Sequence, residues 1–250
     1  MRRLMKRLVA TLLMLVVVFS SAPTTVFADT DTILKDKTNK LILGDTIEEG
    51  TKKINETLDA GKSLTYKLEV PKGGLFIEIT GDSSFKVQIY DSKNKVVKKL
   101  EAVDLMGGAA QQVRNCVALS KGKYKIKISA KSKDSALALN GKVAMISNKT
   151  SRTIACDKEY TTAVTKGKTY KFKFEVEEKS TGVITNLINN YDITYIFPEI
   201  PIYKVADSKG KIVKSFTKGE TPGNVDLKKG TYTLIVEANM TGYLTLRVAY

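Results

Sequence analysis

The stretch that decides the fold is Val117-Ala-Leu-Ser-Lys-Gly-Lys-Tyr-Lys-Ile-Lys-Ile-Ser-Ala130, because it recurs as Val225-Asp-Leu-Lys-Lys-Gly-Thr-Tyr-Thr-Leu-Ile-Val-Glu-Ala238. In each copy a Lys-Gly turn is followed by a Tyr and by a run in which every second residue is apolar. A period of two predicts a β-strand, in which successive side chains point to opposite faces. We expect Gly122 and Gly230 to adopt a positive φ in the two turns. The chain is therefore a tandem repeat.

Two further pairs of segments support the repeat. Residues 61–70 match residues 167–176, with apolar residues at alternate positions and mostly Lys between them. Residues 91–100 match residues 207–216, and both begin with Asp-Ser-Lys. We interpret the second pair as hairpins in which Asp binds its own turn backbone and Asn94 or Gly210 takes the left-handed position.

Many short strands and turn signals, with no helix-length periodicity after the first residues, predict an all-β protein. The predicted architecture is two tandem antiparallel β-sandwiches that are jelly-roll-like. Isolated helical turns are an alternative around residues 46–58 and 102–113. The predicted organisation is a signal peptide at 1–28, a flexible leader at 29–40, a first sandwich at 41–146, a linker at 147–151 and a second sandwich at 152–250.

The first residues have the three-part pattern of a secretory signal peptide. A basic start precedes an apolar run over residues 8–19, and Val26-Phe27-Ala28 ends the segment. We expect cleavage after Ala28, with an uncleaved N-terminal anchor as the alternative. The apolar run is shorter than the roughly 20 residues of a membrane span. The mature chain is therefore predicted to lack a transmembrane segment and to be secreted, or loosely associated with the cell surface.

The chain is strongly basic. Its formal charge of +15 falls to +11 when the four basic residues of the signal peptide are removed. Such a charge favours either attraction to a polyanion or a solvated lysine-rich surface, and we favour the second interpretation. Only Arg114, Arg152 and Arg247 remain as arginines, which is a poor supply of the planar forks that recognise phosphates and bases. No nucleic-acid partner is expected.

Lysines form two stripes on the predicted strands. Lys123, Lys125 and Lys127 share one face of one strand, and Lys171 and Lys173 share one face of another. The stripes are candidates for following a polyanion, with affinity that falls as salt rises. Alternatively, lysines on an exposed strand discourage edge-to-edge aggregation, and we favour this interpretation.

One aromatic segment interrupts the repeat. Residues 181–201 are longer and more aromatic than their counterpart, and the chain has no Trp. Tyr191, Tyr195 and Tyr203 are candidates for a binding surface if they are exposed. If they are buried they only enlarge the core, and this second alternative is favoured.

The absence of His removes the usual nucleophile pairs and the side chain best suited to proton transfer near neutral pH. We therefore predict no enzymatic activity and no catalytic residue. Cys116 and Cys156 are candidates for one disulfide in an oxidising compartment, or are two buried thiols. Two Cys without His cannot form the usual structural zinc site, and no metal site is predicted.

Each copy resembles the bacterial pre-peptidase C-terminal domain, a secreted jelly-roll-like sandwich, and is similar in the same way to clostridial collagen-binding domains. The Asp-Ser-Lys-Asn/Gly hairpin and the Lys-Gly-x-Tyr strand carry the resemblance. It implies an accessory domain without catalysis, often attached to a peptidase. The calcium site of some family members needs clustered carboxylates, but the spacing of the candidates matches no pattern, so no cofactor is predicted. These candidates are Asp29, Asp31, Asp36, Glu48 and Glu49.

These observations predict a secreted, non-catalytic binding or accessory protein. Its expected partner is an extracellular polymer, such as a wall polymer, a polysaccharide or a collagen-like chain, or an extracellular protein. The alternative is a partner or regulator of a separately encoded secreted peptidase that acts by protein–protein contact.

Overall fold

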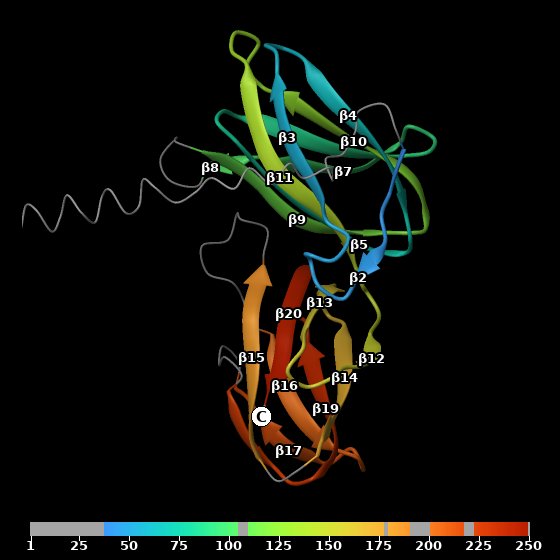
Figure 1. The fold of residues 1–250 in the computed structure, drawn as a ribbon, viewed down its shortest axis with the longest axis vertical. Helices are drawn as coiled ribbons and strands as arrows, with labels where there is room; N and C mark the ends of the chain where they lie inside the picture. The colour runs from blue at the N-terminus through green and yellow to red at the C-terminus, as the bar shows by residue number, and fades with distance from the viewer. Residues whose placement is uncertain (1–37, 105–109, 178–179, 191–200, 218–222, 250) are drawn as a thin grey trace, which may run out of the picture. The chain divides into compact units, whose positions relative to one another are not determined.

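The computed structural model describes residues 38–104, 110–177, 180–190, 201–217 and 223–249, with the backbone alone for 180–190. Every regular element in these ranges is a β-strand, so the predicted all-β class is confirmed. Residues from Asp31 to Tyr250 make up one compact unit. Within this unit, strands β1 to β11 belong to the first repeat and β12 to β20 to the second (Figure 1). The proposed domain boundaries remain a prediction.

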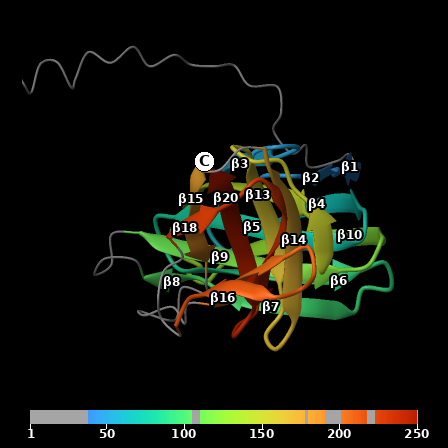
Figure 2. The same ribbon diagram turned by 90° about the horizontal axis from the view of Figure 1, so that it is seen from below.

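The first repeat contains two sheets. One has the strand order β1-β4-β10-β6-β7, and the other has the order β2-β11-β5-β9-β8 with β3 also paired to β11. Figure 2 shows β4, β10 and β6 next to one another. The bounds are β1 Thr38–Lys40, β2 Leu43–Gly44, β3 Lys52–Leu58, β4 Ser63–Val70, β5 Gly73–Gly81, β6 Phe85–Asp91, β7 Val96–Glu101, β8 Val103–Asp104, β9 Gln111–Leu119, β10 Gly122–Ala130 and β11 Leu137–Ile146.

The two sheets of the first repeat enclose one hydrophobic core. Strand β4 alternates between exposed and buried residues, as its sequence pattern predicts. Its buried side chains Tyr66 and Leu68 belong to the same cluster as Leu75 and Ile77 of β5, on the opposite sheet. The repeat is therefore a β-sandwich, because side chains from the inner faces of both sheets share one core.

The second repeat uses a similar arrangement. Its sheets have the orders β12-β14-β19-β16-β17 and β13-β20-β15-β18. A separate hydrophobic cluster combines Phe172 of β14 with Leu244 of β20 across the two layers. The bounds are β12 Ser151–Thr153, β13 Glu159–Val164, β14 Thr169–Val176, β15 Ser180–Asn190, β16 Ile202–Asp207, β17 Ile212–Ser215, β18 Asn224–Leu227, β19 Gly230–Glu237 and β20 Gly242–Ala249.

The structure corrects the predicted leader and the predicted antiparallel sheets. Residues 38–40, assigned to a flexible leader, form β1, which pairs in parallel with β4. Strand β12 pairs in parallel with β14 in the second repeat, and β2 pairs in parallel with β11. These strands have two or three residues each, which is too short for a pattern of two to be recognised in the sequence. The helical turns are also wrong over Lys52–Leu58 and Gln111–Leu119, which are strands.

The predicted hairpins after β6 and β16 are confirmed. Asp91 Oδ1 accepts bonds from the backbone N–H groups of the second and fourth residues after it, each at 2.9 Å, and Asp207 does the same. Asn94 has a φ of 61° and Gly210 a φ of 81°, which are the left-handed positions. The expected positive φ is found at Gly230, with 155°, but not at its counterpart Gly122, although both glycines are the first residues of their strands.

The two repeats meet at a small apolar seam. Phe76, Cys116, Ala144 and Ile146 of the first repeat pack with Ala163 and Tyr243 of the second in one buried cluster. The rings of Phe76 and Tyr243 lie edge to face at 5.0 Å between centroids, a favourable aromatic arrangement. The seam places hydrophobic contact between the two sandwiches.

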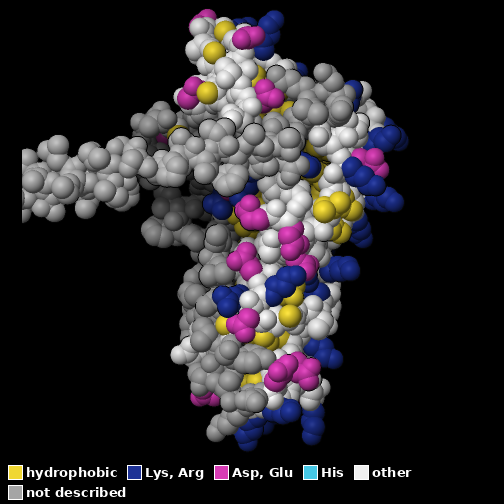
Figure 3. Space-filling view, viewed as in Figure 1, with side chains coloured by type: hydrophobic (Ala, Val, Ile, Leu, Met, Phe, Trp, Pro, Cys, Tyr) yellow, Lys and Arg dark blue, Asp and Glu magenta, His cyan; other side chains and the backbone are white. Residues whose placement is uncertain are grey.

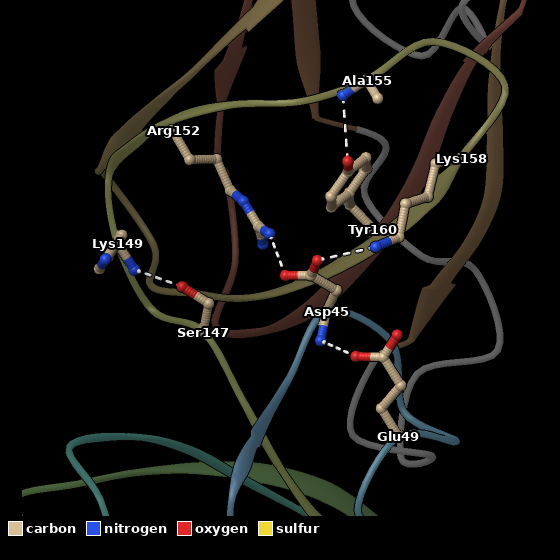
Figure 4. A network of polar contacts seen from close by, with 8 residues as sticks. All are labelled: Asp45, Glu49, Ser147, Lys149, Arg152, Ala155, Lys158 and Tyr160. Atoms are coloured by element: carbon tan, nitrogen blue, oxygen red, sulfur yellow. Dashed lines mark hydrogen bonds and ion pairs between the residues drawn. The ribbon is translucent and has the colours of Figure 1, made fainter.

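A polar network lies beside the seam (Figure 4). Asp45 of the first repeat binds the guanidinium of Arg152, and its Oδ2 lies 3.1 Å from Lys158 Nζ. The Arg152 guanidinium also lies over the Tyr160 ring, 4.7 Å from its centroid. Burial alone raises the pKa of Asp45, but the hydrogen bonds and charges of Lys158 and Arg152 outweigh it and lower the pKa below its usual value. The network therefore adds a charged contact between the repeats.

Candidate binding face of the first repeat

The candidate site is the outer face of the sheet β1-β4-β10-β6-β7. Along β10, Ile126 and Ile128 point into the core and are fully buried. The alternation of the strand therefore places Lys123, Lys125 and Lys127 on the opposite, outer face. The predicted lysine stripe is thus confirmed for this strand, and we call it the β10 stripe.

Pairing with the neighbouring strands β4 and β6 places further residues beside the β10 stripe. Lys125 lies directly opposite Lys67 of β4, and on its other side it lies opposite Tyr90 of β6. Lys127 lies between Thr65 and Gln88. Like charges directly opposite each other in an antiparallel pair destabilise a sheet. The Lys67–Lys125 pair therefore has a cost that the fold itself does not require.

Few acidic groups neutralise this face. Lys125 Nζ donates a 2.8 Å hydrogen bond to Asn94 Oδ1, a neutral acceptor in the hairpin turn. Among the described residues no ion pair involves Lys67, Lys125 or Lys127. Lys123 has Glu69 as its opposite residue on β4. The centre of the face therefore keeps its positive charge available for a ligand.

A cavity lies at the start of β10. Lysines and hydroxyl groups contribute to its lining, together with Asp91, Leu68 and Tyr124. The Tyr124 hydroxyl donates to the Ser120 carbonyl at 3.1 Å, which fixes the ring beside the cavity. Ammonium and hydroxyl donors suit carboxylate, sulfate or phosphate groups. The lysines and hydroxyl residues of the lining are Lys67, Lys123, Lys125, Thr38 and Ser92.

The equivalent face of the second repeat has a different composition. Residues that match the β10 stripe in register are Thr231, Thr233 and Ile235 of β19. The predicted stripe of Lys171 and Lys173 is present and exposed on β14, opposite Ile235 and Thr233. Lys204 of the neighbouring strand β16 also lies opposite Ile235, but its Nζ lies 2.5 Å from Glu237 Oε1. This face therefore lacks the directly opposed lysines that Lys67 and Lys125 form on β4 and β10. Figure 3 shows Lys and Arg side chains along the right-hand edge of both repeats in that view, with acidic side chains among them on the front.

The interpretation of the lysines as protection of a sheet edge is wrong for both strands. Strand β10 lies between β4 and β6, and β14 lies between β12 and β19. Neither stripe lies on an unpaired edge in the described structure, because Lys171 and Lys173 both pair with β12. The lysines therefore do not block edge-to-edge pairing, and this leaves the solvated surface or the polyanion as their explanation.

The aromatic candidates do not form a site in the described residues. Tyr203 is only 1% exposed and belongs to the core of the second repeat, so the favoured core alternative is confirmed for this residue and the binding alternative is wrong. Its strand alternates Tyr203 and Val205 inward around Lys204, and this pattern was a signal for burial. Tyr191 and Tyr195 lie outside the described residues.

Neither cysteine takes part in a disulfide, so the candidate disulfide is not formed. Cys116 is buried in the seam cluster, and burial raises the pKa of its thiol to about 12. Cys156 packs against the core of the second repeat, with its Sγ 3.3 Å from the Glu175 carbonyl oxygen. A protonated thiol enclosed by apolar neighbours is not a nucleophile. Cys116 and Cys156 pack in two different hydrophobic clusters.

The described part of the chain contains no group of three or more His, Cys, Asp or Glu side chains that could hold a metal ion. Glu48 forms an ion pair with Lys142 at 2.6 Å, and Glu49 Oε2 accepts the Asp45 N–H at 2.7 Å. The other calcium candidates, Asp29, Asp31 and Asp36, lie outside the described residues, as does the predicted signal peptide with its cleavage point. Over the described ranges, no helix has the length and apolar character needed to cross a membrane.

Comparison with known families gives one match over part of the chain. Residues 71–138, within the first repeat, match the model of the secretion system C-terminal sorting domain. This similarity supports a secreted or cell-surface location. No curated protein sequence matches the chain.

Solved structures are similar at low identity. The pre-peptidase C-terminal domain of a Bacillus anthracis collagenase has 15% identity over 39% of this chain and 93% of that domain, with a TM-score of 0.31. A carbohydrate-binding module of Cellvibrio mixtus lichenase 5A, in complex with cellotriose, has 17% identity over 37% of this chain and 86% of that module, with a TM-score of 0.27. The CUB1-EGF-CUB2 region of human MASP-1/3 has 9% identity over 80% of this chain and 99% of that region, with a TM-score of 0.26. The family that the sequence resembles is thus among the similar structures.

Proposed function

We propose that the protein is an exported, non-catalytic binding module whose first repeat binds an anionic extracellular polymer through the β10 stripe and Lys67. The preferred ligand class is an acidic polysaccharide. Its carboxylate or sulfate groups would contact the lysines, while its sugar rings would lie against Tyr90. Tyr is a weaker sugar platform than Trp, but its ring offers an apolar face.

One observation carries this proposal: Lys125 lies opposite Lys67 without an acidic neighbour in either register position. The second repeat builds the same sheet with Thr233 opposite Lys173, so the fold does not need two facing lysines. A destabilising pair that the architecture does not require is typical of a binding surface. Ligand anions would relieve the repulsion when they bind.

The test exchanges the two faces. The mature chain, residues 29–250, is applied to immobilised polygalacturonate over a salt series, with neutral dextran as the reference polymer. Replacing Lys123→Thr, Lys125→Thr and Lys127→Ile gives the first repeat the residues of the second. We expect affinity to fall at least tenfold at low salt, which corresponds to about 1.4 kcal/mol. Wild-type affinity should also fall as salt rises, because the contacts are screened.

A charge-matched control distinguishes the effect of the β10 stripe from the effect of the net charge of the chain. The variant Lys171→Thr, Lys173→Thr and Lys229→Thr removes the same charge from exposed positions of the second repeat. It should keep nearly the full affinity. Equal losses in the two triple variants would reduce the effect to net charge and overturn the proposal. Equal retention on dextran and polygalacturonate would overturn it as well.

A gain-of-function variant completes the exchange. Thr231→Lys, Thr233→Lys and Ile235→Lys install the stripe in the second repeat, opposite the existing Lys171 and Lys173. We expect tighter binding than wild type if the basic face is sufficient. An unchanged affinity would show that Tyr90 and the cavity, which the second repeat does not reproduce, are also necessary.

A further inference from the structure

The hairpins β6–β7 and β16–β17 share a feature that binding by the β10 stripe does not use. Strands β7 and β17 are the last strands of their sheets, so each presents an edge in the described structure. Both edges expose large apolar side chains. Val97 is 42% exposed, Ile212 is 42% exposed and Val213 is 45% exposed. Most of the large exposed apolar residues in the described ranges thus lie on these two equivalent strands.

A β-bulge lies at the same position of both edges. In the first repeat Ile89 pairs with Lys98 and Tyr90 with Val96, which leaves Val97 without an opposite residue. In the second repeat Val205 pairs with Lys214 and Ala206 with Ile212, which leaves Val213 in the same situation. A bulge adds one residue and redirects a side chain. The fold therefore presents one valine twice, at matching places.

Lysines surround both valines. Each hairpin carries exposed lysines in the turn and on the edge strand, and few free acids. The Asp91 and Asp207 side chains accept turn N–H groups, and Glu101 is paired with Lys131 at 2.6 Å. The exposed lysines are Lys93, Lys95, Lys98 and Lys99 in the first hairpin, and Lys209, Lys211 and Lys214 in the second.

This charge decides which partner fits. Two copies of the same basic edge repel each other, so the lysines disfavour pairing with a second copy of the chain. An acidic strand has the opposite effect, because it supplies charge complementarity together with main-chain hydrogen bonds to the edge. An exposed valine beside the edge suits an apolar side chain of the incoming segment. A basic polymer or a neutral sugar would satisfy neither requirement.

We infer that β7 and β17 are twin docking edges for an extended, acidic segment of a protein partner that alternates carboxylates with apolar residues. Val97 and Val213 form the apolar contacts, and the surrounding lysines bind the carboxylates. One chain binds two such segments. Strand β6 lies between β10 and β7, and β16 lies between β19 and β17, so the docking edges share no residue with the β10 stripe.

The test uses a defined peptide, a capped ten-residue sequence of alternating Glu and Val, titrated into the mature chain by calorimetry. We expect two peptides per chain. Val97→Ser and Val213→Ser should each reduce the stoichiometry to one, and the double variant should lose binding. Both valines are substantially exposed, so these changes should leave the unfolding transition unaltered, and circular dichroism checks this. Ile42→Ser, which removes an exposed apolar residue elsewhere, is the matched control and should keep both sites.

Charge reversal provides an independent measurement. Lys98→Glu with Lys214→Glu alters register-equivalent positions of the two edges. This variant should bind the Glu–Val peptide at least fivefold more weakly and should bind a Lys–Val peptide that the wild type rejects. The triple variant of the β10 stripe should bind the Glu–Val peptide like wild type, although it loses polygalacturonate.

Three results would overturn the inference. The first is unchanged peptide binding by the double valine variant. The second is equal binding of a Glu–Ser peptide, which has the charge without the apolar residues. The third is a dimer of the chain in sedimentation that disappears in the double valine variant, because a second copy would then be the occupant.

Discussion

The two repeats build the same five-stranded sheet with the same register but put different chemistry on its outer face. Strand β10 presents Lys123, Lys125 and Lys127, whereas β19 presents Thr, Thr and Ile at the matching positions. Both central strands keep apolar side chains on the inner face. The difference teaches that the inner alternation specifies the sandwich, while the outer residues are free to serve binding.

The cores differ at one position in an informative way. Tyr66 of β4 and Phe172 of β14 occupy matching places, opposite Ile126 and Leu234 respectively. Both side chains are fully buried. The Tyr66 hydroxyl has no hydrogen-bond partner among the described residues, and burial raises its pKa. The first repeat therefore tolerates a polar atom that the second omits.

The largest expected effect comes from breaking the seam that joins the repeats. A Cβ at Gly74 would lie 2.3 Å from Ala163 Cβ and 2.8 Å from Cys116 Sγ, neither of which is at the end of a flexible chain. Gly74→Ala should lower the free energy of unfolding by roughly 1–3 kcal/mol, the usual range for overpacking. Chemical denaturation measures the change. Gly223→Ala, where a Cβ meets no atom within 4 Å, is the control and should unfold like wild type. A neutral Gly74→Ala would mean that the two repeats separate at no cost.

The core comparison predicts a smaller effect of opposite sign. Tyr66→Phe gives the first repeat the residue of the second and should raise the free energy of unfolding by about 1 kcal/mol, because it removes a buried hydroxyl without a partner. The reverse change, Phe172→Tyr, should destabilise the second repeat by a similar or larger amount. Thermal and denaturant unfolding of both variants check the pair. Destabilisation by Tyr66→Phe would show that the hydroxyl is bonded in solution.

The smallest expected effect concerns the charged contact between the repeats. The folded pKa of Asp45 lies below its unfolded value, so the ion pairs with Arg152 and Lys158 stabilise the protein above the unfolded pKa, near 4. This stability is lost as the pH falls through the lowered folded pKa. Because the Asp45 side chain is 38% exposed, Asp45→Asn should cost only about 0.5–1 kcal/mol at pH 7. Unfolding at pH 7, 5 and 3 should show the same cost at pH 7 and pH 5 and a smaller cost at pH 3. A cost that stays constant over this range would contradict an electrostatic role.

Local pattern was sufficient for the strands and hairpins of both repeats. Alternation predicts β4, β10, β14 and β19, and the turn chemistry of Asp91 and Asn94 is local to four or five residues. The short parallel strand Thr38–Lys40 gave no signal, because its residues are polar and each pairs with a residue 29 positions further along the chain. Strand identity is thus a short-range property, whereas edge pairing is decided by the assembled sheet.

The candidate site was predictable only in part for the same reason. The spacing of Lys123, Lys125 and Lys127 reveals a common face, but Lys67, Tyr90 and Asn94 join it through pairing between strands distant in sequence. The interpretation as edge protection was wrong because the sequence of one strand does not show which strands lie on either side of it in the sheet. For Tyr203 the favoured core alternative is correct, and its alternation with Lys204 is a local signal of burial.

The seam also has a consequence for the order of folding. A chain that is synthesised from its N-terminus completes β1 to β11 first, while Ala163 and Tyr243 arrive later. Until then Phe76 and Ile146 have no cover from the second repeat, and the first repeat carries an exposed apolar patch. Fragments that end before β13 are therefore expected to be more prone to aggregation than the complete chain, and a chaperone that shields this patch would act during a defined interval of synthesis.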